Sequence, residues 1–230
     1  MLEGKNLHKY YKMGETVVKA LRGINIKLEE GNFTYIVGPS GSGKTTLLDL
    51  LGALSRPTKG KVLYKGKELN KFNDYQLSMF RRKKVGFVFQ TYNLNKSLTA
   101  LENVLVPLQP IGITKKDRLK ARKLLKETGL GKRINHKPTQ LSGGEIQRVT
   151  VARAMINDPD IVLADEPTGE LDSKTGEKVM KYMRKMNEEK NTSFLIVTHD
   201  AEYIEKGDRL IEMKDGKLIK DGINKEKWIH

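Results

Sequence analysis

The spacing of apolar and polar residues predicts strands and helices that alternate along the chain. Residues 2–28 alternate well enough to predict two antiparallel strands around a turn at residues 13–15. Residues 33–37 form an apolar stretch, and residues 160–165 form a near-continuous apolar run of the type that parallel sheets bury. Further strands are predicted at residues 60–64, 84–89 and 193–197, and a closing hairpin at residues 209–221.

Helical spacing of the apolar residues fills most of the remaining chain. Helices are predicted at residues 46–51 and 173–187, and residues 98–154 are helical in pattern with no β-rich run. This order predicts an α/β fold with a mostly parallel sheet, an antiparallel β subdomain at the N-terminus and an inserted α-helical subdomain. We expect the core to comprise residues 1–90 and 159–230, and the helical subdomain residues 91–158.

The segment between the apolar stretch and the first helix fits the pattern G-x-x-x-x-G-K-[ST] at every position. Its residues, with the one that follows, are Gly38, Pro39, Ser40, Gly41, Ser42, Gly43, Lys44, Thr45 and Thr46. The glycines let backbone N–H groups surround a triphosphate, Lys44 can reach its β- and γ-phosphates, and the Thr45 hydroxyl can bind Mg²⁺. A chance glycine-rich turn would not explain the strand before it and the helix after it. We therefore expect a P-loop nucleoside triphosphatase core.

A carboxylate pair follows the apolar strand at residues 160–165. Asp165 ends this strand and is expected to bind Mg²⁺ through water, and Glu166 could polarise an attacking water. The alternative is a strand that has acidic residues at its exit into Pro167. The phosphate-binding loop upstream favours the catalytic interpretation.

The composition places the chain among globular proteins. It has 230 residues, of which 37% are hydrophobic and 31% charged, and it has no apolar run of membrane-spanning length. The lack of cysteine excludes disulfides, zinc–thiolate sites and thiol nucleophiles. Because the first residues lack the apolar region of a signal peptide, we expect a cytoplasmic protein.

The net charge of +15 is high for a chain of this size. Such a charge can indicate a nucleic acid partner, an anionic membrane surface or a lysine-rich solvated exterior. The lysines are spread along the chain, with one denser stretch at residues 115–126. Basic residues are not interleaved with aromatic ones as in single-strand binders, so we expect no nucleic acid partner.

A second segment opens a helix with two glycines after a serine: Leu141-Ser142-Gly143-Gly144-Glu145-Ile146-Gln147. Such a helix N-terminus is also ready to bind an anion, although one phosphate-binding loop is enough for one triphosphate. With this element the chain resembles, over nearly its whole length, the nucleotide-binding subunits of ABC (ATP-binding cassette) transporters. In that family the signature segment of one subunit covers the ATP bound by the other. The resemblance implies that two copies of this chain enclose two ATP, each contacted by Ser142, Gly143, Gly144 and Glu145 of the other copy.

The resemblance implies roles for four further residues. Tyr11, with Tyr10 as a neighbouring candidate, matches the aromatic residue that stacks on adenine; an ordinary strand tyrosine is the alternative. Gln90 matches the glutamine that senses Mg²⁺ and water and links to the membrane subunit, and Asp172 belongs to the loop that communicates across the dimer. His199 matches the histidine that contacts the γ-phosphate, although histidines at strand ends are more often structural.

Two positions depart from the family pattern. Glu145 stands where glutamine is most frequent, and Glu170 stands in the dimer loop where a small residue is usual. Glu170 adds negative charge where the partner's phosphate-binding loop should come, which would slow or tune closure. Because Glu166 and His199 are both present, we expect a site competent in hydrolysis.

The resemblance also implies an integral membrane transporter subunit as partner, with this chain peripheral on the inner face of the cell membrane. Residues 91–94 with Leu98, Leu101 and Val104 are candidates for docking that partner; the alternative is that these leucines pack the helical subdomain. Residues 86–104 and 167–176 resemble the lipoprotein-release, macrolide-export and antimicrobial-peptide-resistance branch, which implies transport of lipid, lipoprotein, peptide or drug. The rival interpretation is a soluble ABC-type ATPase that acts on DNA or in assembly of another complex.

Overall fold

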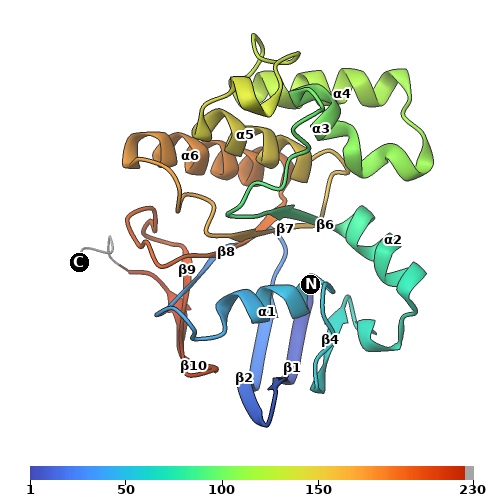
Figure 1. The fold of residues 1–230 in the computed structure, drawn as a ribbon. Helices are drawn as coiled ribbons and strands as arrows, with labels where there is room; N and C mark the ends of the chain where they lie inside the picture. The colour runs from blue at the N-terminus through green and yellow to red at the C-terminus, as the bar shows by residue number, and fades with distance from the viewer. Residues whose placement is uncertain (226–230) are drawn as a thin grey trace. The chain divides into compact units, whose positions relative to one another are not determined.

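The computed structural model describes residues 1–225, which cluster into two compact units (Figure 1). The first unit comprises Met1–Arg81 and the described residues from Leu195 onward, and the second comprises Arg82–Phe194. The division at residue 91 and residue 158 expected from the sequence remains a prediction. Among the described residues, no helix combines the length and the apolar character that a membrane span requires.

The first unit contains an antiparallel sheet with the strand order β2-β1-β4-β5. Its strands are β1 (Leu2–Met13), β2 (Thr16–Leu28), β4 (Lys59–Tyr64) and β5 (Lys67–Glu68). The β1–β2 turn contains Gly14 at a φ of 60°, a conformation that glycine adopts without steric cost. The predicted antiparallel element is therefore confirmed, with its turn at the predicted place.

The first unit also holds strands in the order β10-β9-β3-β8. Here β3 (Phe33–Val37) pairs in parallel with β9 (Arg209–Lys214), and β9 pairs antiparallel with β10 (Lys217–Ile223). The strand β8 (Ser193–Val197) starts in the second unit and ends in the first. Every residue of β3 and β8 is buried, as their continuous apolar runs predict.

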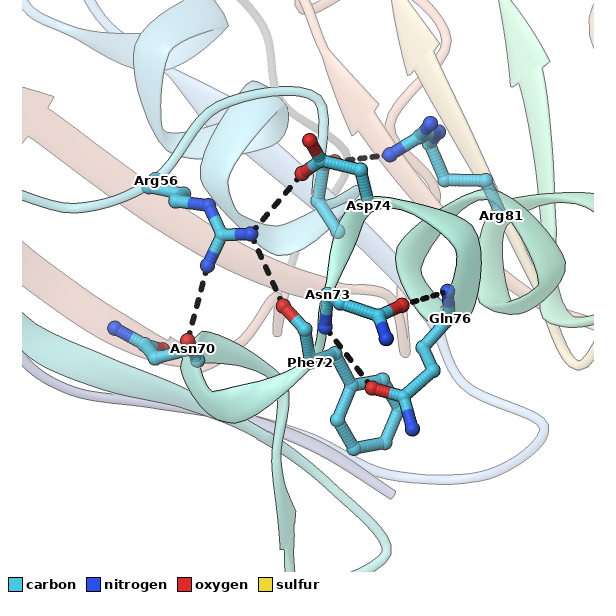
Figure 2. A network of polar contacts seen from close by, with 8 residues as sticks. Arg56, Asn70, Phe72, Asn73, Asp74, Gln76 and Arg81 are labelled. Atoms are coloured by element: carbon cyan, nitrogen blue, oxygen red, sulfur yellow. Dashed lines mark hydrogen bonds and ion pairs between the residues drawn. The ribbon is translucent and has the colours of Figure 1, made fainter.

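Helix α2 (Asp74–Lys84) and the short η1 turn (Leu69–Lys71) before it were not predicted from the sequence. The side chains of Asn73 and Gln76 each accept a hydrogen bond from the backbone N–H of the other, which satisfies two donors at the start of α2 (Figure 2). An N-x-x-Q pattern before Leu77 was therefore the available signal.

Arg56 ties this segment to the chain that follows the phosphate-binding loop's helix, α1 (Lys44–Leu51). Its guanidinium donates to the carbonyl oxygens of Asn70 and Phe72, each at 3.0 Å, and to the Asp74 carboxylate at 3.2 Å (Figure 2). The planar guanidinium of arginine has several N–H donors, so it can bind these three acceptors at once. The start of α2 is thus fixed relative to the end of α1 by hydrogen bonds within the first unit.

The second unit contains β6 (Val85–Val88), which pairs in parallel with β7 (Ile161–Asp165). Strand β8 follows β7 in the strand order. The remaining elements of this unit are α3 (Ala100–Leu105), η2 (Val106–Ile111), α4 (Lys115–Glu127), η3 (Pro138–Gln140), α5 (Gly143–Ala154) and α6 (Ser173–Lys190). Helix α5 packs against α3, α4 and α6 and against β6, so it is the central helix of this unit.

Two of the residues suggested for docking a membrane partner are core residues instead. Leu101 and Val104 lie on the buried side of α3, with 6% and 0% of their surfaces exposed. The packing alternative therefore holds for both, because the capped helix α3 turns them toward the interior. Leu94 and Leu98 are half-buried.

We expect Arg56→Ala to lower the free energy of unfolding by about 1–2 kcal/mol, since it leaves two carbonyl groups without their donor. Urea unfolding measures this change. Asp74→Ala is the control, because it removes an exposed ion pair and one acidic residue from the first turn of α2, and it should cost less than about 1 kcal/mol. Equal losses in the two variants would contradict the importance of the backbone contacts.

Candidate functional site

The phosphate-binding loop joins the buried strand β3 to helix α1 within the first unit. Helix α1 begins at Lys44 after Gly43, which has a left-handed φ of 98°, and has no acidic residue in its first turn. The N-terminal dipole end of α1 is therefore not neutralised by the chain itself. Pro39, Ser40, Gly41 and Thr45 are exposed, so the loop can be reached from solvent.

The glycines at both ends of the loop allow close backbone packing. A Cβ at Gly43 would lie 2.5 Å from the carbonyl oxygen of Ala20, and one at Gly38 would lie 2.1 Å from that of Met213. The β9–β10 turn also contacts the loop, because the Gly216 N–H donates to the Ser42 carbonyl at 3.1 Å. The loop shape is thus imposed by strands from both ends of the chain.

Two buried polar groups of the loop fit a phosphate ligand. Lys44 is 7% exposed, and its ammonium donates to the carbonyl oxygens of Gly38 at 2.7 Å and Pro39 at 3.1 Å. These acceptors are neutral, so an anion would lower the cost of burying this cation. The Ser42 hydroxyl is also buried and lacks a hydrogen-bond partner among the described residues. A polyphosphate would satisfy both groups.

The two candidate tyrosines differ in their surroundings. Tyr10 is half-buried and its hydroxyl lies 3.0 Å from His8 Nδ1. Tyr11 is 40% exposed, and it pairs across the hairpin with Val18, which is 43% exposed. Between them, Tyr11 is the more accessible for stacking on a planar base.

His199 follows β8, and its neighbour Thr198 places it beside the phosphate-binding loop. The Thr198 N–H donates to the carbonyl of Ile36 at 3.1 Å, which aligns the ends of β8 and β3 at one edge. His199 itself is exposed. The first unit thus gathers Lys44, Thr45 and His199 near the carboxyl ends of its strands, the usual ligand position in α/β sheets.

In the second unit, Gln90 and Glu166 come together at Gly169. A Cβ at Gly169 would lie 3.6 Å from Gln90 Nε2 and 3.5 Å from Glu166 Cβ. Glu166 directly follows Asp165 at the end of β7 and has a φ of 46°, a left-handed conformation that is costly for a residue with a side chain. Such strain persists where the surrounding structure imposes it, and it is concentrated at functional sites.

Helix α5 begins at the signature segment with a reciprocal cap. The Ser142 hydroxyl accepts from the Glu145 N–H at 3.3 Å, and the Glu145 carboxylate accepts from the Ser142 N–H at 3.0 Å. The remaining carboxylate oxygen of Glu145 accepts from Arg133 Nε at 3.0 Å. The Ser142 N–H and then Arg133 lower the pKa of Glu145. Ser142 and Gly143 remain exposed.

The signature glycines permit close contacts with α6 and with the loop that follows β6. A Cβ at Gly144 would lie 2.1 Å from Thr175 Cγ2, so only glycine lets α5 approach α6 here. A Cβ at Gly143 would lie 3.3 Å from the Tyr92 hydroxyl. That hydroxyl hydrogen-bonds Glu170, and burial followed by the Glu170 charge raises the pKa of Tyr92. The unusual Glu170 thus has a partner within its own chain.

Two side chains that the sequence analysis did not assign hold these loops onto α5. Gln147 is 1% exposed, and its Nε2 donates to the Pro167 carbonyl at 2.7 Å, next to the strained Glu166. Arg153 donates to the carbonyl oxygens of Asn93 at 2.6 Å and Tyr92 at 2.9 Å. The only sequence signal for these roles was that Gln147 and Arg153 are polar residues within a mostly buried helix.

Asp172, assigned to the dimer loop, has a structural task in this chain. It is the N-cap of α6, and its carboxylate accepts from the Thr175 N–H at 3.0 Å. Hydrogen bonds from Thr175 lower the pKa of Asp172. The dimer role expected for this residue remains a prediction.

The described residues contain no group of three or more histidine, cysteine, aspartate or glutamate side chains arranged to hold a metal ion. Mg²⁺ commonly binds through one or two protein oxygens together with substrate phosphates and water. The Thr45 hydroxyl, the Asp165 carboxylate and the Gln90 amide are oxygen donors of that kind.

Comparison with known proteins places this geometry in a family. The family model described as ABC transporter matches residues 21–169. An ABC transporter ATP-binding protein of Thermotoga maritima is 48% identical over 95% of this chain and 93% of its own length. The macrolide export ATP-binding/permease protein MacB of Hyphomonas neptunium is 44% identical over 98% of this chain. MacB is longer, and the matched region covers 35% of its length.

Solved structures agree with this placement. MJ0796 of Methanocaldococcus jannaschii is 47% identical over 96% of this chain and 96% of its own length. Its dimeric cassette structure superposes with a TM-score of 0.90 over 97% of this chain and 98% of that one. A second dimeric structure of MJ0796, in a post-hydrolysis state with ADP and Pi, gives a TM-score of 0.89 over the same shares of both chains. The expected fold class is therefore confirmed.

We expect Gln147→Leu to lower the free energy of unfolding by about 1–3 kcal/mol, because the buried Pro167 carbonyl loses its donor while the side-chain volume is nearly kept. Chemical denaturation measures the change. Gln109→Leu, at an exposed position in η2, is the control and should shift stability by less than about 0.5 kcal/mol. A Gln147 variant as stable as this control would contradict the anchoring role.

We expect the stability difference between the wild type and Glu145→Gln to depend on pH. The folded-state pKa of Glu145 lies below its ordinary value, so its ionised form stabilises the fold above that ordinary value. The contribution is lost as pH falls through the folded-state pKa. Urea unfolding should therefore show a difference of about 0.5 kcal/mol at neutral pH that disappears in acid. Glu188→Gln, at an exposed position on α6, should give a pH-independent difference; the same outcome for Glu145→Gln would contradict the cap.

Proposed function

The chain belongs to the ABC transporter family, and we propose that two copies of it close around two ATP molecules to power a membrane transporter. Its activity is the hydrolysis of ATP to ADP and phosphate. The observation that carries the proposal is the presence of two separate helix N-termini suited to anions, at α1 and at α5. One nucleotide occupies the first, so the second is available to the nucleotide of another copy.

The first unit binds the nucleotide in this proposal. The loop from Gly38 to Thr46 surrounds the phosphates with backbone N–H groups, and Lys44 pairs with the β- and γ-phosphates. The buried, unpartnered Ser42 hydroxyl supports this assignment. Tyr11 stacks on adenine, and the exposure of its ring is consistent with that role.

Hydrolysis then depends on positioning and charge. Glu166 orients the attacking water and accepts its proton, and His199 holds the γ-phosphate in register. Thr45, Gln90 and Asp165 would hold Mg²⁺, the last through water, and the ion would supply positive charge against the phosphate oxygens. The convergence of Gln90 and Glu166 at Gly169 supports a shared task for these two residues.

The second copy completes the site in this proposal. Its Ser142, Gly143, Gly144 and Glu145 cover the γ-phosphate, and the loop that contains Asp172 responds to the nucleotide across the dimer. Because catalysis needs this second copy, ATP binding drives closure and hydrolysis allows separation. The reported dimeric states of MJ0796 support this cycle by similarity.

The similarity to MacB supports a transporter of the export or extraction type, with lipid, lipoprotein, peptide or drug as cargo. The name of MacB includes both an ATP-binding and a permease function, which supports an integral membrane transporter subunit as the partner in this proposal. We place the chain on the cytoplasmic side of the membrane, bound to that subunit. A role on DNA is the alternative that the net charge of +15 favours.

We expect Glu166→Gln to form a stable dimer in the presence of ATP, because ATP still binds while hydrolysis falls about 100-fold or more. Size-exclusion chromatography with light scattering measures the dimer, and phosphate release measures the activity.

Two matched variants make this test specific. Lys44→Ala in the Glu166→Gln background should stay monomeric with ATP, because the phosphates lose their cation. Glu202→Gln neutralises an exposed acid after β8 and should behave as the wild type. A Glu166→Gln protein that remains monomeric with ATP would refute ATP-driven closure.

A further inference from the structure

The solvent side of helix α4 carries only cations and one leucine. Among the thirteen residues of α4 are seven basic and two acidic ones. The exposed residues of α4, called here the basic face, are Lys115, Lys116, Arg118, Leu119, Arg122, Lys123 and Lys126. The opposite side, with Ala121, Leu124 and Leu125, is buried where α4 packs on α3 and α5 (Figure 1). The basic face is therefore a continuous surface of one helix.

Both acidic residues of α4 have partners in or next to the helix. The Asp117 carboxylate accepts from the backbone N–H of Thr114 at 2.8 Å and thereby caps the helix. Glu127 pairs with Lys123 at 3.6 Å, which is the only ion pair of the basic face among the described residues. Asp117 also attracts Lys116, and Glu102 attracts Arg118, so these two cations are partly neutralised. The basic face nevertheless keeps an excess of positive charge, which would attract an anionic surface.

An exposed leucine lies at the centre of this charge. Leu119 is 69% exposed, and its neighbours three and four residues away along the helix are Lys115, Lys116, Arg122 and Lys123. Ile111, 59% exposed, precedes the helix in the chain. A partner that has both negative charge and an apolar interior would neutralise the cations and also remove Leu119 from water.

We propose that the basic face of α4 binds the anionic phospholipid surface of a membrane, with Leu119 inserted among the headgroups. Lysine and arginine attract acidic headgroups, and the apolar side chain enters the boundary with the acyl chains. A nucleic acid backbone would pair with the cations, but it would leave Leu119 without an apolar partner, and α4 offers no aromatic ring for base stacking. The proposal does not depend on ATP, on dimerisation or on a membrane subunit.

Flotation of the full chain with vesicles tests this interface. Vesicles of equal parts phosphatidylcholine and phosphatidylglycerol should carry the protein at low salt, and vesicles of phosphatidylcholine alone should not. Each neutralised cation should weaken binding about fivefold, so Lys116→Gln/Arg122→Gln/Lys123→Gln should lower the partition coefficient about 100-fold. Leu119→Ser should lower it about tenfold with little change in its salt dependence.

The control variant is Lys178→Gln/Lys181→Gln/Lys185→Gln on α6, which has the same net charge as the α4 variant and neutralises exposed lysines of the same unit. It should weaken vesicle binding by less than about threefold, because long-range attraction is screened beyond the Debye length. Thermal melts confirm that all variants remain folded.

Three outcomes would overturn the proposal. The first is that the α4 and α6 triple variants lose vesicle binding equally, and the second is that the wild type binds neutral and anionic vesicles equally. The third is that the protein does not bind vesicles and the α4 substitutions weaken its binding to duplex DNA instead. A wild-type protein that does not bind the anionic vesicles but dimerises normally with ATP would refute this inference alone and leave the proposed function standing.

Discussion

Helix α5 fixes the two loops on which the chemistry of the second unit depends. Gln147 holds the backbone beside Glu166 through the Pro167 carbonyl, and Arg153 holds the Tyr92 and Asn93 carbonyls. Glu166, Tyr92 and Asn93 all have positive φ values, which residues with side chains rarely adopt. Hydrogen bonds from one rigid helix maintain these conformations. The helix that begins at the signature segment thus also shapes the loops after β6 and β7.

In the first unit, the phosphate-binding loop keeps the cation Lys44 buried. Lys44 is placed by the αL turn at Gly43, and the loop's own carbonyl groups accept its hydrogen bonds. Gly43 approaches Ala20 so closely that a Cβ would lie 2.5 Å from the Ala20 carbonyl oxygen, so this turn requires glycine. A preorganised donor of this kind pays little reorganisation cost when an anion binds.

Capping residues in this chain occupy positions that the family resemblance assigns to nucleotide contacts. Ser142 caps α5 and Asp172 caps α6, so each serves helix stability in the isolated chain. Ser142 is exposed at the helix N-terminus, where an incoming phosphate would meet it. The same local geometry therefore supports both the fold and the proposed contact with a second copy.

The sequence by itself determined the elements whose signals are local. The alternation of apolar and polar residues predicted the β1–β2 hairpin, and continuous apolar runs predicted β3, β7 and β8. The spacing of the glycines predicted the phosphate-binding loop. Helix α2 was missed although its Asn73 and Gln76 cap was present. Only the tertiary structure decided that Leu101 and Val104 are buried, that Glu170 meets Tyr92, and that Gln147 and Arg153 hold distant carbonyl groups. Those contacts join residues that lie 20 or 61 positions apart for Gln147–Pro167 and Arg153–Tyr92, and no local spacing encodes a partner at such separations.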